Sequence, residues 1–109
     1  MLNQNAKSRR GAVKPVAPTP VRILEATVSS PAVTITFDQP VRLSGLPAYG
    51  VDVGAGTVAQ ANQTAPNQVE LVYSEVITGA TTLTIPYQDP AIRSSAGGFV
   101  ADTLYLMAA

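Results

Sequence analysis

The segment AVTITFD, residues 32–38, carries the clearest structural signal in the chain. Its apolar residues Val33, Ile35 and Phe37 alternate with threonines and Asp38. Successive side chains of a β-strand point to opposite faces, so this period of two predicts a strand with one buried face. The segments 67–74 and 80–87 alternate in the same way, with Tyr73 and Tyr87 continuing their inward faces. The expected core set is Val33, Ile35, Phe37, Val69, Leu71, Leu83 and Ile85.

Outside these segments, the chain from Val21 onward consists of short apolar runs between turn residues. No window keeps a helical period, and strands separated by turns at such short intervals are typical of all-β domains. We therefore expect an all-β fold: an antiparallel β-sandwich of about seven strands, with a small barrel as the alternative. The further segments expected as strands are 21–29, 41–43, 48–54 and 99–107, with 56–64 as an edge strand or loop and 94–98 as a loop.

The composition points away from catalysis. The 109 residues suffice for one domain, and 46% hydrophobic against 13% charged residues is typical of a chain that forms a core. Cysteine, histidine and tryptophan are absent, so no disulfide or Cys–His pair can form and a serine nucleophile would lack its usual base. We expect no enzymatic activity and no required cofactor or metal. The acids Asp38, Asp52, Asp89 and Asp102 are expected on loops or facing solvent, with calcium between Asp89 and Asp102 as an open alternative.

Two segments carry a family resemblance. VTITFDQPVRL (33–43) is similar to the early strand of the bacterial Ig-like domains of surface-layer and adhesin proteins, and TTLTIPYQDPAIRSSAGGFVADT (81–103) resembles their late segment. In that late segment the family has an Asp-x-x-Gly-Asn turn, where this chain has Ser94 and Gly98 in place of the Asp and the Asn. The resemblance implies an Ig-like β-sandwich, a domain type also used in bacteriophage virion accessory proteins. Fold alone does not define function.

The first twenty residues differ from the rest. They hold four cations and no acid, a net charge of +4, whereas residues 21–109 hold three arginines against seven acidic residues, a net charge of −4. Three prolines follow the cations, and because proline favours extended conformations, we expect a stiff, extended arm. A basic segment on an acidic body is typical of an interaction tail. We therefore divide the chain into an arm, 1–20, and a domain, 21–109, with partner-binding residues Lys7, Arg9, Arg10, Lys14, Pro15, Pro18 and Pro20.

These features predict a non-enzymatic structural protein of a bacteriophage virion, a capsid decoration or other accessory protein anchored by its arm. Its partners would be the major capsid protein or neighbouring copies, without membrane contact. If Met1 is the natural start, the absence of a signal-like apolar stretch predicts synthesis in the host cytoplasm. The alternatives are an Ig-like module of a bacterial surface protein that binds carbohydrate or protein, and a virion protein whose arm contacts nucleic acid. The four tyrosines are expected in the core or at its rim rather than as a sugar-binding strip.

Overall fold

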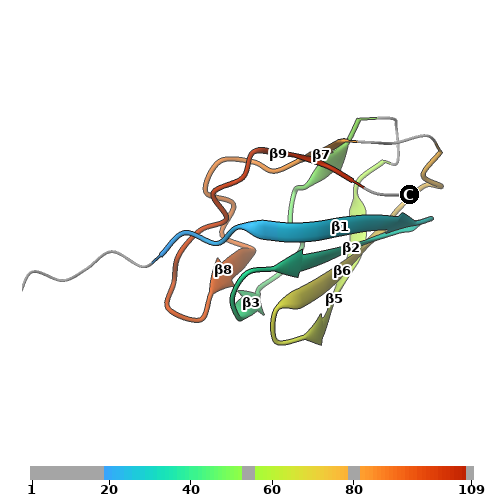
Figure 1. The fold of residues 1–109 in the computed structure, drawn as a ribbon. Helices are drawn as coiled ribbons and strands as arrows, with labels where there is room; N and C mark the ends of the chain where they lie inside the picture. Colours follow the sequence, from blue (N-terminus) through green and yellow to red (C-terminus); the bar gives the residue numbers. More distant parts are fainter. Residues whose placement is uncertain (1–18, 53–55, 79–81, 108–109) are drawn as a thin grey trace, which may run out of the picture.

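The computed structural model describes residues 19–52, 56–78 and 82–107. These described residues form β-strands, turns and loops without a helix (Figure 1). The strands in the described ranges are β1 (Ile23–Ser29), β2 (Ala32–Phe37), β3 (Val41–Leu43), β4 (Gly50–Val51), β5 (Val58–Ala65), β6 (Gln68–Tyr73), β7 (Thr82–Thr84), β8 (Ile92–Ser94) and β9 (Leu104–Leu106). A search of the same residues for a helix able to cross a membrane finds none.

Strands β1, β2, β6 and β5 form an antiparallel sheet, in the order β1-β2-β6-β5. The central pair β2–β6 sets Val33 opposite Leu71 and Ile35 opposite Val69. All four of these side chains are buried on the inner face, while Thr34 and Thr36 remain partly exposed between them. The alternation predicted for 32–38 and 67–74 is therefore confirmed, and segment 56–64 lies largely within the edge strand β5.

The remaining strands form two smaller antiparallel groups, β4-β7-β9 and the ribbon β3-β8. Figure 1 shows β7 and β9 above the four-stranded sheet, apart from it. Side chains from both sides meet in one core, because Phe37 and Leu71 of the large sheet belong to the same buried cluster as Leu83 of β7 and Ile92 of β8. The protein is thus all-β, with antiparallel sheets arranged in the manner of a sandwich. The expected core set is confirmed: each of its seven side chains is at most 2% exposed.

The alternation expected in 80–87 fails at Tyr87, whose side chain is 82% exposed. Strand β7 ends at Thr84, and Pro86 has no N–H with which to continue a ladder. Gln88 then takes a left-handed φ of 52°, which turns the chain. The inward orientation predicted for Tyr87 is therefore wrong.

The end of the domain also differs from expectation. Segment 99–107 is not one strand: β9 covers Leu104–Leu106, while residues 99–101 pair separately with Val21 and Arg93. Likewise, the expected loop 94–98 begins one residue late, because Ser94 is the last residue of β8 and is buried. In segment 48–54, β4 covers only Gly50–Val51, and Val53 lies outside the described residues.

Candidate functional site: the arm end

The domain fixes the last two residues of the arm, Thr19 and Pro20, which we call the arm root. Gln39 Nε2 donates hydrogen bonds to the carbonyl oxygens of Thr19 (3.4 Å) and Pro20 (3.1 Å). The next residue, Val21, donates its N–H to Phe99 O (2.9 Å) and accepts from Ala101 N–H (2.8 Å). The arm root is therefore held at a defined place, beside residues 97–101. We call this face of the molecule the arm end.

Of the residues predicted to bind a partner, the structure places one. Pro20 is exposed and lies in the arm root. The other six, Lys7, Arg9, Arg10, Lys14, Pro15 and Pro18, lie outside the described residues.

A tight loop packs against the arm root. Ser94 N–H donates to Gly98 O, and Gly98 N–H donates to the Ser94 hydroxyl, both at 2.8 Å. Gly97 has a φ of +98°, a conformation that favours glycine. A Cβ on Gly98 would lie 2.5 Å from Thr19 O and 3.3 Å from Ser94 Oγ. Glycine at 98 is therefore what allows the arm root to lie this close to the loop.

We expect Gly98→Ala to destabilise the domain by about 1–3 kcal/mol, since the added methyl must push either the arm root off Gln39 or the loop off Ser94. Urea unfolding measures the change. Gly50→Ala is the matched control, because a Cβ there would meet only Thr84 Cβ, at 4.0 Å. Equal stabilities for Gly98→Ala and wild type would show that the arm root is not held against Gly98.

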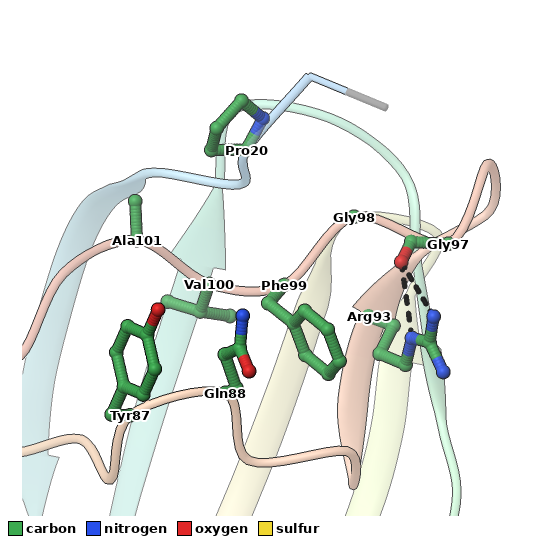
Figure 2. Close-up of a pocket in the computed structure, with 9 residues that line it drawn as sticks. All are labelled: Pro20, Tyr87, Gln88, Arg93, Gly97, Gly98, Phe99, Val100 and Ala101. Carbon is green, nitrogen blue, oxygen red and sulfur yellow. Dashed lines mark hydrogen bonds between the residues drawn. The ribbon is translucent and has the colours of Figure 1, made fainter. Parts of the chain in front are cut away.

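An apolar groove of about 450 Å³ opens beside the arm root (Figure 2). It is lined by Pro20, the pair Tyr87–Gln88, Arg93 and residues 97–101. Figure 2 shows Tyr87 and Gln88 along one side and Phe99 and Val100 across from Pro20. Because Tyr87 is exposed rather than buried in the core, the groove has an aromatic ring free to contact another molecule.

Arg93 closes one end of this groove. Its guanidinium carbon lies 4.5 Å from the centre of the Phe99 ring, a cation–π contact. Its Nε and Nη2 donate to Gly97 O at 3.1 and 2.8 Å, as Figure 2 shows. Arg93 thereby holds the Phe99 ring and the 94–98 loop together, so this wall of the groove is preformed.

On the other side of Arg93 lies a second hollow of about 480 Å³, which we call the serine hollow. It is lined by Arg42, Ser44, Pro90 and residues 93–97. Arg42 and Arg93 are directly opposite each other in the β3–β8 ribbon, an arrangement in which like charges repel. Within the described ranges Arg22 forms a salt bridge, to Asp102 at 3.3 Å, while neither Arg42 nor Arg93 pairs with a carboxylate. The serine hollow is therefore a locally cationic surface on an acidic domain.

Asp89 and Asp102, considered above as calcium ligands, accept hydrogen bonds from backbone N–H groups. Asp89 accepts the N–H groups of Ala48 (2.9 Å) and Ala91 (3.0 Å), and Asp102 accepts that of Ile23 (2.8 Å). Among the described residues, no three Asp, Glu, His or Cys side chains group together as a metal site would need. These contacts give both aspartates a structural role.

The four tyrosines do not form a strip. Tyr49 and Tyr73 are buried, Tyr105 is half-buried with its hydroxyl donating to Leu24 O (2.8 Å), and Tyr87 alone of the four is fully exposed. The expectation of core or rim packing thus holds for three of them, and Tyr87 stands apart at the groove.

Sequence reasoning missed the groove and the serine hollow. Both depend on long-range placement: Arg42 meets Arg93 only through the register of β3 on β8, and Phe99 approaches Pro20 only through the pairing with Val21. The one local signal was Pro86 before Tyr87, which breaks the strand and releases the ring.

Comparison of the chain with protein-family models, with curated proteins and with solved structures found no match in any of the three. The described residues thus form an all-β domain with antiparallel sheets, in which the arm root is fixed beside an apolar groove.

Proposed function

We propose that this chain is a non-enzymatic structural protein of a bacteriophage virion, a capsid decoration or other accessory protein attached through its arm end. The observation that carries the proposal is the fixed arm root, held by Gln39 and Val21 beside a preformed apolar groove. A leader without a function would not need this anchoring. The arm is the main attachment device, and the arm end of the domain supplies a second contact.

The strand order supports an Ig-like fold for the domain. Ig constant-type domains have one sheet in the order A-B-E-D and a second in the order C-F-G. The sheet β1-β2-β6-β5 corresponds to the first order if β1, β2, β5 and β6 are A, B, D and E, and β4-β7-β9 then corresponds to the second. The ribbon β3-β8 is an addition to this scheme, and it carries the serine hollow.

Charge supports an acidic protein partner. The arm contributes Lys7, Arg9, Arg10 and Lys14, and the arm end adds Arg42 and Arg93, both without a carboxylate partner among the described residues. The arm cations precede the arm root in the sequence, whereas the domain as a whole has a net negative charge. Complementary charge steers association and fixes orientation, so we expect an acidic patch on the capsid surface that receives this end.

Deleting residues 2–18 tests the proposal. The arm root stays in place, so the domain should remain folded with an unchanged melting temperature. Incorporation into particles that lack the protein should be abolished, which co-sedimentation and gel analysis measure. If the shortened protein binds these particles as well as the full chain does, the arm is only a leader and the proposal fails.

A second variant separates the contribution of the arm cations to particle binding from that of the prolines. Replacing Lys7, Arg9, Arg10 and Lys14 by glutamine removes the charge and keeps the proline run. If their partners are exposed acids, each cation contributes about 0.2–1 kcal/mol. We expect this variant to bind the particles more weakly than wild type and to lose most of the salt dependence of binding.

A further inference from the structure

We propose that the apolar groove receives the segment Pro15-Val16-Ala17-Pro18 from the arm of a second copy, so that copies are linked arm to groove. The inference rests on the proposed attachment role of the arm and names one of its partners. The groove is part of the described structure, and the segment that fits it lies just beyond the arm root.

The groove has the chemistry that recognises extended, proline-rich peptides. Such ligands bind in aromatic-lined grooves, where rings contact the prolines and side-chain donors reach the exposed backbone carbonyls. Here Tyr87 and Phe99 supply the rings, and the Gln88 amide supplies a donor at the rim. Gln88 stands in the left-handed region, with φ at 52°. Backbone outliers of this kind cluster at functional sites, and this one presents Tyr87 and Gln88 side by side on the groove.

The arm has the matching segment. Residues 15–18 form the sole Pro-x-x-Pro of the whole sequence, and none of the four is charged. Their two prolines have no N–H to satisfy, and they restrict the free arm to extended conformations, so little entropy is lost on binding. An apolar, extended segment is suited to an apolar groove.

The prolines of the arm oppose insertion of this segment into the groove of its own chain. Thr19 lies against Gly98, and its carbonyl oxygen accepts a hydrogen bond from Gln39 Nε2. To enter its own groove, the chain would have to reverse direction between Pro18 and Pro20. Prolines 18 and 20 each bias the residue before them to extended conformations, which opposes such a reversal. Pro18 is bonded directly to Thr19, so at ~3.1 Å per residue the four residues reach about 12 Å beyond the arm root, and the groove that receives them belongs to a copy in direct contact.

Charge sets the direction of the bound segment. Arg93 closes one end of the groove. Lys14 precedes Pro15, so the segment should lie with Pro18 towards Arg93 and Lys14 at the opposite end of the groove. The reverse orientation would place two cations together.

Such a contact is heterologous, because the groove of one copy binds the arm of another. Heterologous contacts close into rings when the rotation between copies permits and otherwise extend into chains. Neighbouring copies on a particle would in this way support each other's attachment.

A mixing experiment tests the inference with full-length chains. One variant loses the groove (Tyr87→Ser) and the other loses the segment (Pro15→Ser with Pro18→Ser). In sedimentation velocity, wild type should associate progressively with concentration, and each variant alone should associate at least about tenfold more weakly. Mixed together, the two variants should form a one-to-one dimer that grows no further, because the mixture retains one intact groove and one intact arm. Leu106→Ser is the matched control, since this side chain is 78% exposed and lies on β9, outside the groove, and it should associate as wild type does.

Three results would overturn the inference: a wild type that stays monomeric, a Tyr87→Ser variant that associates like wild type, or variants that fail to pair when mixed although wild type associates. Particle co-sedimentation of the same proteins distinguishes this failure from failure of the proposed function. If wild type is monomeric but still enters particles through its arm, the arm has another receptor and only the groove inference is lost. If wild type neither associates nor enters particles, both are lost.

Discussion

Phe37→Ala is expected to lower the free energy of unfolding by about 3–5 kcal/mol, because it removes a buried ring and leaves a cavity. Phe37 is fully buried in the core and pairs with Ile23 of β1. Its backbone is also fixed, since Phe37 N–H donates to Asn67 O (2.8 Å) and Asn67 Nδ2 donates to Phe37 O (3.1 Å). These bonds limit how far the chain can collapse into the space. Small domains have a total stability of roughly 5–15 kcal/mol, so this single change removes much of it.

Urea unfolding followed by circular dichroism measures the effect of Phe37→Ala. Leu24→Ala on the neighbouring strand is the matched control, because the Leu24 side chain is 61% exposed. Its substitution should change stability by less than about 0.5 kcal/mol. A similar loss in both variants would mean that β1 and β2 do not face the core as described.

The sequence predicted the core well because its signal is local. Val33, Ile35, Phe37, Val69 and Leu71 each follow from a period of two within a single strand. No partner strand is needed to see which face is apolar, and both segments carry the pattern without a proline or glycine to interrupt it.

The site could not be predicted in the same way. Tyr87 continues the pattern of Leu83 and Ile85, but Pro86 and the turn at Gln88 reverse its direction. The close approach of Phe99 to Pro20, and of Arg42 to Arg93, depends on how distant segments pair. The arm was identified by charge and proline content, yet the surface that fixes its root comes from residues 39 and 97–101, which have no distinguishing sequence pattern.

The stability of the domain is expected to fall steeply above about pH 10, where tyrosines of an unfolded chain lose their protons. Burial raises the pKa of Tyr49 far above its ordinary value, with smaller effects from Asp89, Tyr73 and Asp102, and burial also raises that of Tyr73. Above this pH the unfolded chain therefore binds fewer protons than the folded chain, and stability declines as pH rises. Each tyrosine contributes a slope of up to ~1.4 kcal/mol per pH unit, and below about pH 9 neither contributes.

Two phenylalanine variants separate the contributions of Tyr49 and Tyr73 to the loss of stability at high pH. Tyr49→Phe and Tyr73→Phe should each remove about half of the alkaline slope in urea unfolding, and the double variant should remove both shares. At pH 7 the two substitutions should change the free energy of unfolding in opposite directions. The Tyr49 hydroxyl is buried and has no hydrogen-bond partner among the described residues, so Tyr49→Phe should stabilise by about 1 kcal/mol. Tyr73 Oη donates to Tyr49 O (2.9 Å), so Tyr73→Phe should destabilise by about 1–2 kcal/mol and leave that buried carbonyl unpaired. If both variants keep the full alkaline slope, the loss of stability at high pH comes from groups other than these two rings.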